Sequence, residues 1–167
     1  MTSERFDKAY YDRFYRNAQT RAVSPAAAKR QATFIAAYLK HLEVPIKSIV
    51  DIGCGVGTLL RALQRAFPRA RCQGVELSDY LCQRYGWVSG SAKDYEASTP
   101  YDLVICNDVL PYLDDRPCIQ ALSNLGKLSR GALYFGALTR EDLAQCDPDR
   151  TDLQQHVRPV AWYRDRL

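Results

Sequence analysis

The chain has 167 residues, 47% of them hydrophobic and 25% charged, with a formal net charge of +4. This length fits one domain with a sizeable core, and the composition is that of a globular protein rather than a disordered or collagen-like chain. No stretch approaches the roughly 20 apolar residues of a membrane span, and the first residues lack an apolar signal-peptide core. We therefore expect a soluble cytoplasmic protein that does not bind membranes.

The surplus of positive charge lies at the amino-terminal end, where residues 1–47 carry nine Lys or Arg and four Asp or Glu. No dense basic run is present, which favours a solvated helix surface over attraction of an anionic ligand and argues against nucleic-acid binding. The six cysteines include no C-x-x-C pair, so zinc-ligand spacing is absent. We expect buried, unreactive thiols and no metal site.

Residues 6–15 are rich in aromatic side chains. A helix here would collect five rings on about one side, because they recur at four-residue steps; they are Phe6, Tyr10, Tyr11, Phe14 and Tyr15. Two interpretations have equal weight: a helix that docks on the core, and a lid over a ligand pocket to which Tyr11, Tyr15 or Arg13 contributes.

A second helix is expected next, with Ser24 as its N-cap and Pro25 at its first position. Its apolar face comprises Ala28, Ala32, Ile35, Ala36, Leu39 and Leu42. Pro45 then interrupts the helix. We expect residues 1–44 to form a helical cap on a core of residues 45–140, all within a single domain.

A strand over Ser48–Ile52 should lead into a glycine-rich turn and a helix over Thr58–Phe67. Glycine at positions 53, 55 and 57 removes every second Cβ and lets the backbone approach a bound molecule closely, while the helix presents free N–H groups to the same place. The next strand, Arg71–Glu76, ends in a carboxylate about as far downstream as a ribose-binding acid. Together these features predict a bound adenosine-type cofactor.

The glycine spacing distinguishes two kinds of cofactor. A nicotinamide or flavin site favours G-x-G-x-x-G, but Thr58 stands at the third glycine position. Asp51, Gly53, Gly55 and Gly57 instead form D-x-G-x-G-x-G, and here the chain resembles the class I S-adenosylmethionine-dependent methyltransferases. The resemblance covers about residues 48–138 and implies S-adenosyl-L-methionine as cofactor and a Rossmann-like core.

The resemblance also implies roles for individual residues. The glycine turn would contact the methionine part of the cofactor, and Glu76 would hold both ribose hydroxyls. A carboxylate suits this task because it can accept two O–H donors at once. The expected cofactor-binding residues are Asp51, Gly53, Cys54, Gly55, Glu76, Leu77, Ser91, Ala92, Asn107 and Tyr11.

Two weaker motifs extend the resemblance. Residues 90–94 occupy the place of the family's adenine loop, with Ser91 where an acid is common and Asp94 as a substitute. Residues 101–113 are similar to the fourth-strand motif, whose end would bring Asn107, Asp108 and Tyr112 to the active site. The expected catalytic residues are Asp108 and Tyr112.

A general base is needed only if the acceptor is protonated, and contributes roughly 10² to 10⁴ in rate. Asp108 is the first candidate for it, followed by Tyr112 and then His156. His156 lies in a polar stretch typical of a solvated loop, and His41, at a helix end, is expected to be structural.

The remaining pattern completes a doubly wound, mostly parallel sheet, and the family resemblance implies the strand order 3-2-1-4-5. It predicts helices over Ser78–Tyr85 and Arg116–Leu128 and strands over Gly86–Gly90, Asp102–Asn107 and Ala132–Leu138. After residue 140 only a polar loop and a short helix, Pro159–Leu167, are expected, so the carboxyl-terminal end is shortened relative to the family. The fifth strand would then lie at an edge of the sheet, where its backbone groups could pair with another chain. Truncation of the sequence, cover by the tail or a homodimer partner would each account for this edge.

Three function classes follow. The first is methyl transfer from S-adenosylmethionine to a small-molecule or natural-product acceptor. The second is a non-catalytic protein of the same fold that acts through cofactor or protein binding, and the third is a nicotinamide-dependent oxidoreductase, which the glycine spacing disfavours.

Overall fold

The computed structural model describes residues 5–167 and contains one five-stranded sheet. Its central strand, β1 (Ser48–Ile52), is buried at all five positions, which is typical of a parallel strand covered on both faces. β1 pairs in parallel with β2 (Arg71–Glu76) and with β4 (Tyr101–Asn107). β3 (Val88–Ser89) and β5 (Ser129–Gly136) complete the sheet at its two edges. The observed order, β3-β2-β1-β4-β5, confirms the predicted topology.

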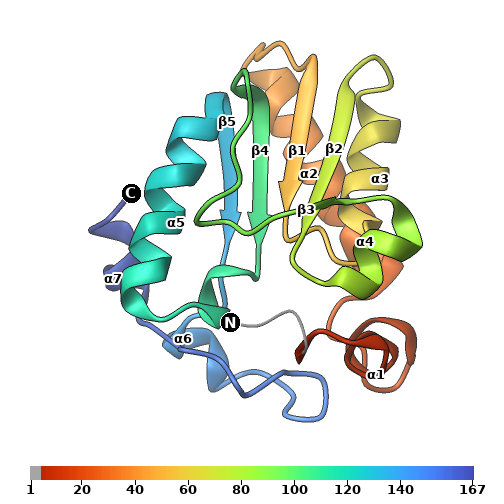
Figure 1. Cartoon of the computed structure of the whole chain (residues 1–167), viewed down its shortest axis with the longest axis vertical. Helices are drawn as coiled ribbons and strands as arrows, with labels where there is room; N and C mark the ends of the chain where they lie inside the picture. Colours follow the sequence, from red (N-terminus) through yellow and green to blue (C-terminus); the bar gives the residue numbers. More distant parts are fainter. Residues whose placement is uncertain (1–4) are drawn as a thin grey trace.

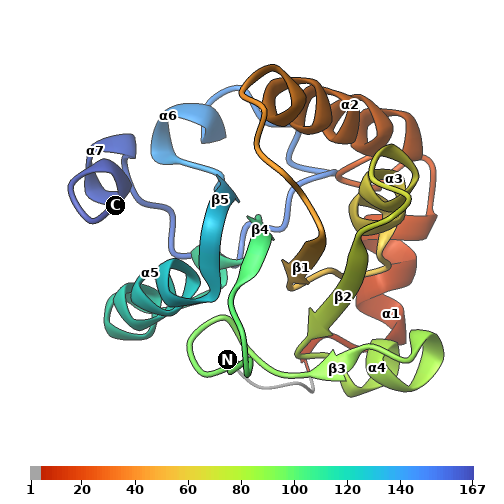
Figure 2. The same cartoon turned by 90° about the horizontal axis from the view of Figure 1, so that it is seen from above.

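Helices cover both faces of this sheet (Figures 1 and 2). On one face, α2 (Pro25–His41) and α3 (Thr58–Ala66) pack against alternate strand residues such as Ile49, Leu103 and Ile105. On the other face, α5 (Asp115–Leu128) packs against Val50 and Val104 and their neighbours. α2 begins as predicted, because the Ser24 hydroxyl accepts a hydrogen bond from the Ala27 N–H.

The expected apolar face of α2 is wrong at one position, and one apolar side chain of α5 is also exposed. Leu42 follows the last residue of α2 and is 52% exposed, and Ile119 on α5 is 46% exposed. Both residues match the apolar spacing of their helices, but no neighbouring element lies over that part of either surface within the described chain. The spacing alone therefore did not identify the buried face.

The amino-terminal segment is less regular than the predicted helix. α1 has only four residues, Lys8–Tyr11, and continues as a π-helical turn over Asp12–Arg16. The wider turn departs from the four-residue repeat, so the five rings are not equally placed: Phe6, Tyr11 and Phe14 are buried, whereas Tyr15 is 38% exposed. Phe6 and Tyr11 pack on Leu81 of α4 (Asp79–Tyr85).

The carboxyl-terminal part differs in detail from the prediction. β5 begins at Ser129, three residues earlier than expected, and is followed by an unpredicted helix, α6 (Arg140–Leu143). The last helix, α7 (Val160–Arg164), is shorter than Pro159–Leu167 and places Tyr163 against Phe135 of β5. Arg158 forms a parallel bridge with Thr139 just beyond β5, so the tail meets the sheet only at that end.

The amino-terminal segment and the stretch after α6 both lie at the end of the sheet to which the strand arrows point (Figure 1). This is the edge where ligands bind in open parallel sheets. In residues 5–167, no helix is long and apolar enough to cross a membrane, and no group of three or more His, Cys, Asp or Glu side chains is placed to hold a metal ion.

Candidate active site

The glycine turn after β1 is shaped by contacts that leave no room for side chains. Gly53 and Gly55 have φ values of +74° and +54°, which non-glycine residues rarely adopt. A Cβ on Gly53 would lie 2.3 Å from Cγ2 of Val109, and one on Gly55 would lie 3.3 Å from Cε1 of Tyr15. Glycine is therefore required here both by backbone conformation and by the close packing of Val109 and Tyr15.

Glu76, at the end of β2, joins this turn to the amino-terminal segment. Its Oε2 accepts a hydrogen bond from the Gly55 N–H at 2.8 Å, and Oε1 accepts from the N–H groups of Leu77 at 2.8 Å and Ser78 at 3.0 Å. The Tyr11 hydroxyl donates to Oε1 at a longer distance, 3.4 Å. Because a carboxylate offers about four acceptor sites, Oε2 keeps room for a further donor such as a ribose hydroxyl.

Asp51 is a second carboxyl group at the same edge of the sheet. It is buried, and no hydrogen bond reaches its side chain from residues 5–167. Burial, and secondarily the nearby charge of Glu76, raises the pKa of Asp51 to about 7. A buried, unpartnered carboxyl group favours a cationic ligand group, because a nearby positive charge would stabilise its ionised form.

Asn107 is the last residue of β4, Asp108 follows it, and both are fixed by hydrogen bonds. The Asn107 amide accepts from Nε2 of Gln31 at 2.9 Å and donates to Oδ2 of Asp108 at 2.7 Å. Asp108 has a φ of +56°, in the left-handed region, and its N–H donates to the Gly136 carbonyl at 2.8 Å. Such strained residues cluster at functional sites. Burial raises the pKa of the Asp108 carboxyl group, and the Asn107 amide partly opposes this rise.

Tyr112 lies in the 3₁₀ turn Leu110–Tyr112 and is connected to both terminal segments. Its hydroxyl is 2.8 Å from the Tyr10 hydroxyl and accepts from Nε2 of Gln155 at 3.1 Å. Burial raises the pKa of Tyr112 to about 12, so this phenol is a poor base near neutral pH.

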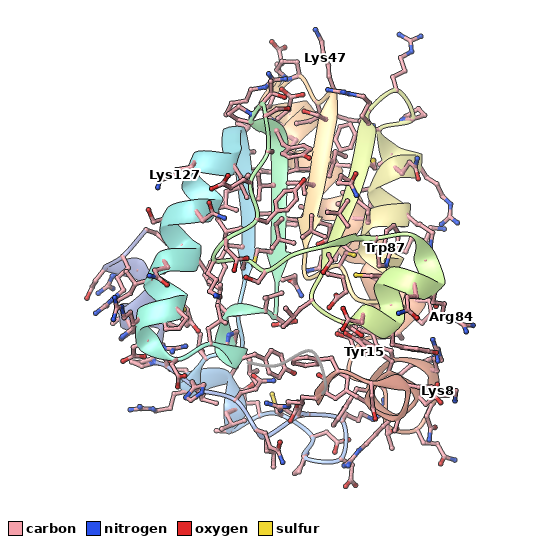
Figure 3. The ribbon with its side chains drawn as sticks, in the orientation of Figure 1. Lys8, Tyr15, Lys47, Arg84, Trp87 and Lys127 are labelled. Carbon is pink, nitrogen blue, oxygen red and sulfur yellow. The ribbon has the colours of Figure 1, made fainter. Side chains whose placement is uncertain are left out.

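Three cavities meet at Tyr15 and Asp108. The first, about 50 Å³, is also lined by Gly53, Glu76 and Ser91, and the second, about 90 Å³, by Asp51 and Gln31. The third, about 330 Å³, lies between the aromatic segment and residues 146–155. Figure 3 shows Tyr15 between the amino-terminal segment and the ends of the strands.

Every predicted cofactor-binding residue lines the first or second cavity except Gly55, whose N–H binds Glu76 and whose α-carbon lies against Tyr15. Both predicted catalytic residues line the first and the third cavities. Asp94 instead accepts a hydrogen bond from the Ser91 hydroxyl at 2.6 Å and lines neither of the first two cavities.

His156, His41 and Arg13 lie outside the three cavities, whereas Cys54 lines the second. His156 is at the surface, 3.2 Å from Oδ1 of Asp114, and His41 is exposed at the end of α2. The Arg13 guanidinium stacks on the Phe14 ring at 4.9 Å. Cys54 is buried in the second cavity, where burial raises the pKa of its thiol and keeps it unreactive.

Sequence reasoning missed three supporting residues. Trp87 donates from Nε1 to the Gly55 carbonyl at 3.0 Å and packs against the glycine turn, beside which Figure 3 labels it. Arg158 is buried and donates from Nη2 to the Leu113 carbonyl at 2.6 Å, which holds the turn that carries Tyr112. Gln155 lines the third cavity. None belongs to a motif, and no spacing in the sequence indicated their positions.

The parallel 3-2-1-4-5 sheet and a carboxylate bound to its glycine turn define a class I methyltransferase fold. A profile described as a methyltransferase domain matches residues 11–163, so the chain belongs to this family. The resemblance to the class I S-adenosylmethionine-dependent methyltransferases is thereby confirmed.

Individual relatives are distant. The chain is 28% identical over 129 residues to cephaeline 6'-O-methyltransferase CiOMT of Carapichea ipecacuanha, covering 72% of this chain and 36% of that protein. It is 30% identical over 110 residues to a malonyl-[acyl-carrier protein] O-methyltransferase of Anoxybacillus flavithermus, covering 59% of this chain and 42% of that protein. The chain thus spans less than half the length of either relative.

Among solved structures, the fold is similar to that of magnesium protoporphyrin IX methyltransferase (ChlM) from Synechocystis PCC 6803 with bound SAH. The TM-score is 0.70 at 20% sequence identity, covering 98% of this chain and 84% of ChlM. At this identity the similarity concerns the fold alone.

Proposed function

We propose that this protein transfers a methyl group from S-adenosyl-L-methionine to a small-molecule or natural-product acceptor. The observation that carries the proposal is the hydrogen bond from the Gly55 N–H to the Glu76 carboxylate, which joins the acid expected to bind ribose to the glycine turn. A dinucleotide site is disfavoured by Thr58, which occupies the third glycine position and begins α3.

The described residues fit this cofactor. Glu76 would take the ribose hydroxyls, Leu77, Ser91 and Ala92 would surround the adenine, and Tyr11 would close over the sugar. Asp51 has a buried carboxyl group with no hydrogen-bond partner, which suits the positive charge of the methionine part. The bound cofactor supplies a methyl group already activated on a sulfonium.

The amino-terminal segment covers this site. The first two cavities, about 50 and 90 Å³, are each smaller than the roughly 300 Å³ of typical ligand sites. Arg5 also joins the segment to the tail, because its Nη2 donates to Oδ2 of Asp152 at 2.8 Å. We therefore infer that residues 5–16 form a lid, which opens to admit the cofactor and closes over it.

Catalysis then depends mainly on alignment. Holding two reactants in a near-attack arrangement is worth roughly 7 to 11 kcal/mol. Asp108 is the candidate base, because a carboxylate with a raised pKa accepts a proton from a hydroxyl group more readily. Asp108 would take the proton of the acceptor as the acceptor receives the methyl group, and the electron pair of the carbon–sulfur bond would remain on sulfur. Tyr112, with a pKa of about 12, would position the acceptor rather than take its proton.

The direct test is isothermal titration calorimetry of the protein with S-adenosylmethionine, S-adenosylhomocysteine and NAD. We expect binding of the first two and none of NAD, whereas binding of NAD alone would establish the oxidoreductase alternative. The non-catalytic alternative is motivated by Ser91, which stands where the family often has an adenine-binding acid. It predicts cofactor binding without any transfer of labelled methyl groups to a metabolite extract.

A further inference from the structure

The third cavity has the position of an acceptor site, and its walls carry information about the acceptor. It shares Tyr10, Tyr15, Asp108 and Tyr112 with the first cavity, so a molecule in it would face the expected methyl position. At about 330 Å³ it has the size of a small-ligand site.

One wall of this cavity is aromatic. The Tyr10 ring lies 5.0 Å from Phe14 and 6.4 Å from Tyr15, measured between ring centroids, and Tyr112 adds a fourth ring. Rings at such distances offer faces and edges that favour stacking with another ring. Flexible aliphatic ligands gain less from such a wall.

The opposite wall comes from residues 146–155, and most of its polar groups already have partners. Asp147 is paired with Arg150 at 3.4 Å, and Asp152 with Arg5 at 2.8 Å. The Thr151 hydroxyl donates to the Asp147 carbonyl at 2.8 Å. Asp147 and Asp152 are thus paired with arginines, which leaves Asp108 as the carboxylate lining this cavity that has no ion pair among the described residues.

Two hydrogen-bond acceptors are left for a ligand. The Asp108 carboxylate receives a side-chain hydrogen bond only from Asn107 among the described residues. Gln155 donates from Nε2 to Tyr112, which fixes its amide, while its Oε1 is buried without a partner in the described chain. A buried acceptor without a partner is unfavourable, and a ligand donor would satisfy it.

We propose that the third cavity binds a planar aromatic acceptor with at least two hydroxyl or amino groups, one donating to Asp108 and one to Gln155. The Asp108 carboxylate in this cavity disfavours acceptors that present a second carboxylate at the methyl position. This inference rests on the proposed methyl transfer, because only that reaction makes the bound molecule an acceptor. The binding specificity of the cavity can be measured independently of the reaction.

The test is saturation-transfer NMR with the full chain, with and without S-adenosylhomocysteine, using catechol, phenol, benzoate and trans-cyclohexane-1,2-diol as probes. We expect catechol to bind several-fold more tightly than phenol and at least tenfold more tightly than benzoate or the cyclohexanediol. Gln155→Leu should remove the advantage of catechol over phenol, and Tyr15→Leu should weaken both aromatic probes. Tyr38→Leu, at an exposed site on α2 outside the three cavities, is the matched control and should change nothing.

Each outcome decides the question. Equal binding of catechol and the cyclohexanediol, tighter binding of benzoate, or a catechol preference that survives in Gln155→Leu would overturn the inference. Binding of the aromatic probes without any binding of S-adenosylhomocysteine would support the cavity specificity and contradict the methyltransferase function. Binding of S-adenosylhomocysteine without binding of any aromatic probe would contradict the cavity specificity and support the methyltransferase function.

Discussion

At the scale of single residues, the site is organised by two carboxyl groups on neighbouring strands. Asp51 lies opposite Gly74 in the β1–β2 register, two residues before Glu76. Glu76 is satisfied by backbone N–H groups, whereas Asp51 has no hydrogen-bond partner in the described chain. The two buried carboxyl groups therefore differ: backbone N–H groups hold the Glu76 side chain on the turn, whereas burial raises the pKa of Asp51.

Asp51→Asn should stabilise the cofactor-free protein, and by more at pH 8 than at pH 5. Its pKa is raised from 3.8 to about 7, so the folded state holds a proton that the unfolded state releases, and stability from this group falls as pH rises through that window. The substitution should therefore gain roughly 2 to 3 kcal/mol more at pH 8 than at pH 5, since one unit of pKa corresponds to about 1.4 kcal/mol. Urea denaturation of both proteins at both pH values measures this, and an equal gain would contradict the raised pKa.

Asp51 should also affect cofactor binding. A cationic ligand group beside it would lower its pKa and release a proton near pH 7. Calorimetric heats of S-adenosylmethionine binding should then depend on the ionisation enthalpy of the buffer, and Asp51→Asn should remove that dependence. Buffer-independent heats for the unsubstituted protein at pH 7 would argue against this contact.

At the scale of elements, the active site depends on segments that the strand pattern does not specify. The strand ends and the glycine turn follow from apolar runs, glycines and acids that can be read directly along the chain. The π-helical turn Asp12–Arg16 and the tail loop depend on contacts between the two ends of the sequence, such as Arg5 with Asp152. Sequence patterns describe neighbours along the chain, so the glycine turn was predicted but the geometry of the amino-terminal segment and the position of Gln155 were not.

Removal of residues 1–20 should weaken S-adenosylhomocysteine binding at least tenfold, because Tyr11 and the surrounding rings would no longer close over Glu76. Since this deletion also exposes Leu81, Arg5→Ala is the milder variant and should raise the dissociation rate several-fold. Arg13→Ala, an exposed site in the same segment, is the control. Stopped-flow fluorescence measures these rates, and affinity unchanged by the deletion would exclude a lid.

Arg158→Ala should destabilise the protein by about 2 to 3 kcal/mol. The substitution removes the donor to the Leu113 carbonyl, the ion pair with Asp115 and the stacking on Trp162, where the guanidinium lies 4.5 Å from the ring centroid. Arg164→Ala, at an exposed arginine of α7, should change stability by less than about 0.5 kcal/mol. Guanidinium denaturation monitored by circular dichroism compares the two, and equal effects would refute the holding role of Arg158.

At the scale of the whole molecule, the fold brings distant segments to one edge of the sheet. The glycine turn, the end of β2, the end of β4, the aromatic segment and the tail meet around Tyr15 and Asp108. The parallel sheet was predictable because strands and helices alternate along the chain, and the resemblance to the family supplied the strand order. Within the described chain, the outer edge of β5 has no neighbouring strand, and homodimerisation through it stays a prediction that sedimentation velocity can test.

The central claim is that Glu76 on the glycine turn binds the ribose of S-adenosylmethionine. Titration calorimetry with S-adenosylhomocysteine on the unsubstituted protein, Glu76→Gln and the exposed-site control Glu96→Gln tests it most directly. We expect Glu76→Gln to weaken binding by about tenfold to a hundredfold, since charge-assisted hydrogen bonds are worth about 1.5 to 3 kcal/mol, and Glu96→Gln to have no effect. Unchanged affinity in a folded Glu76→Gln protein would contradict the account.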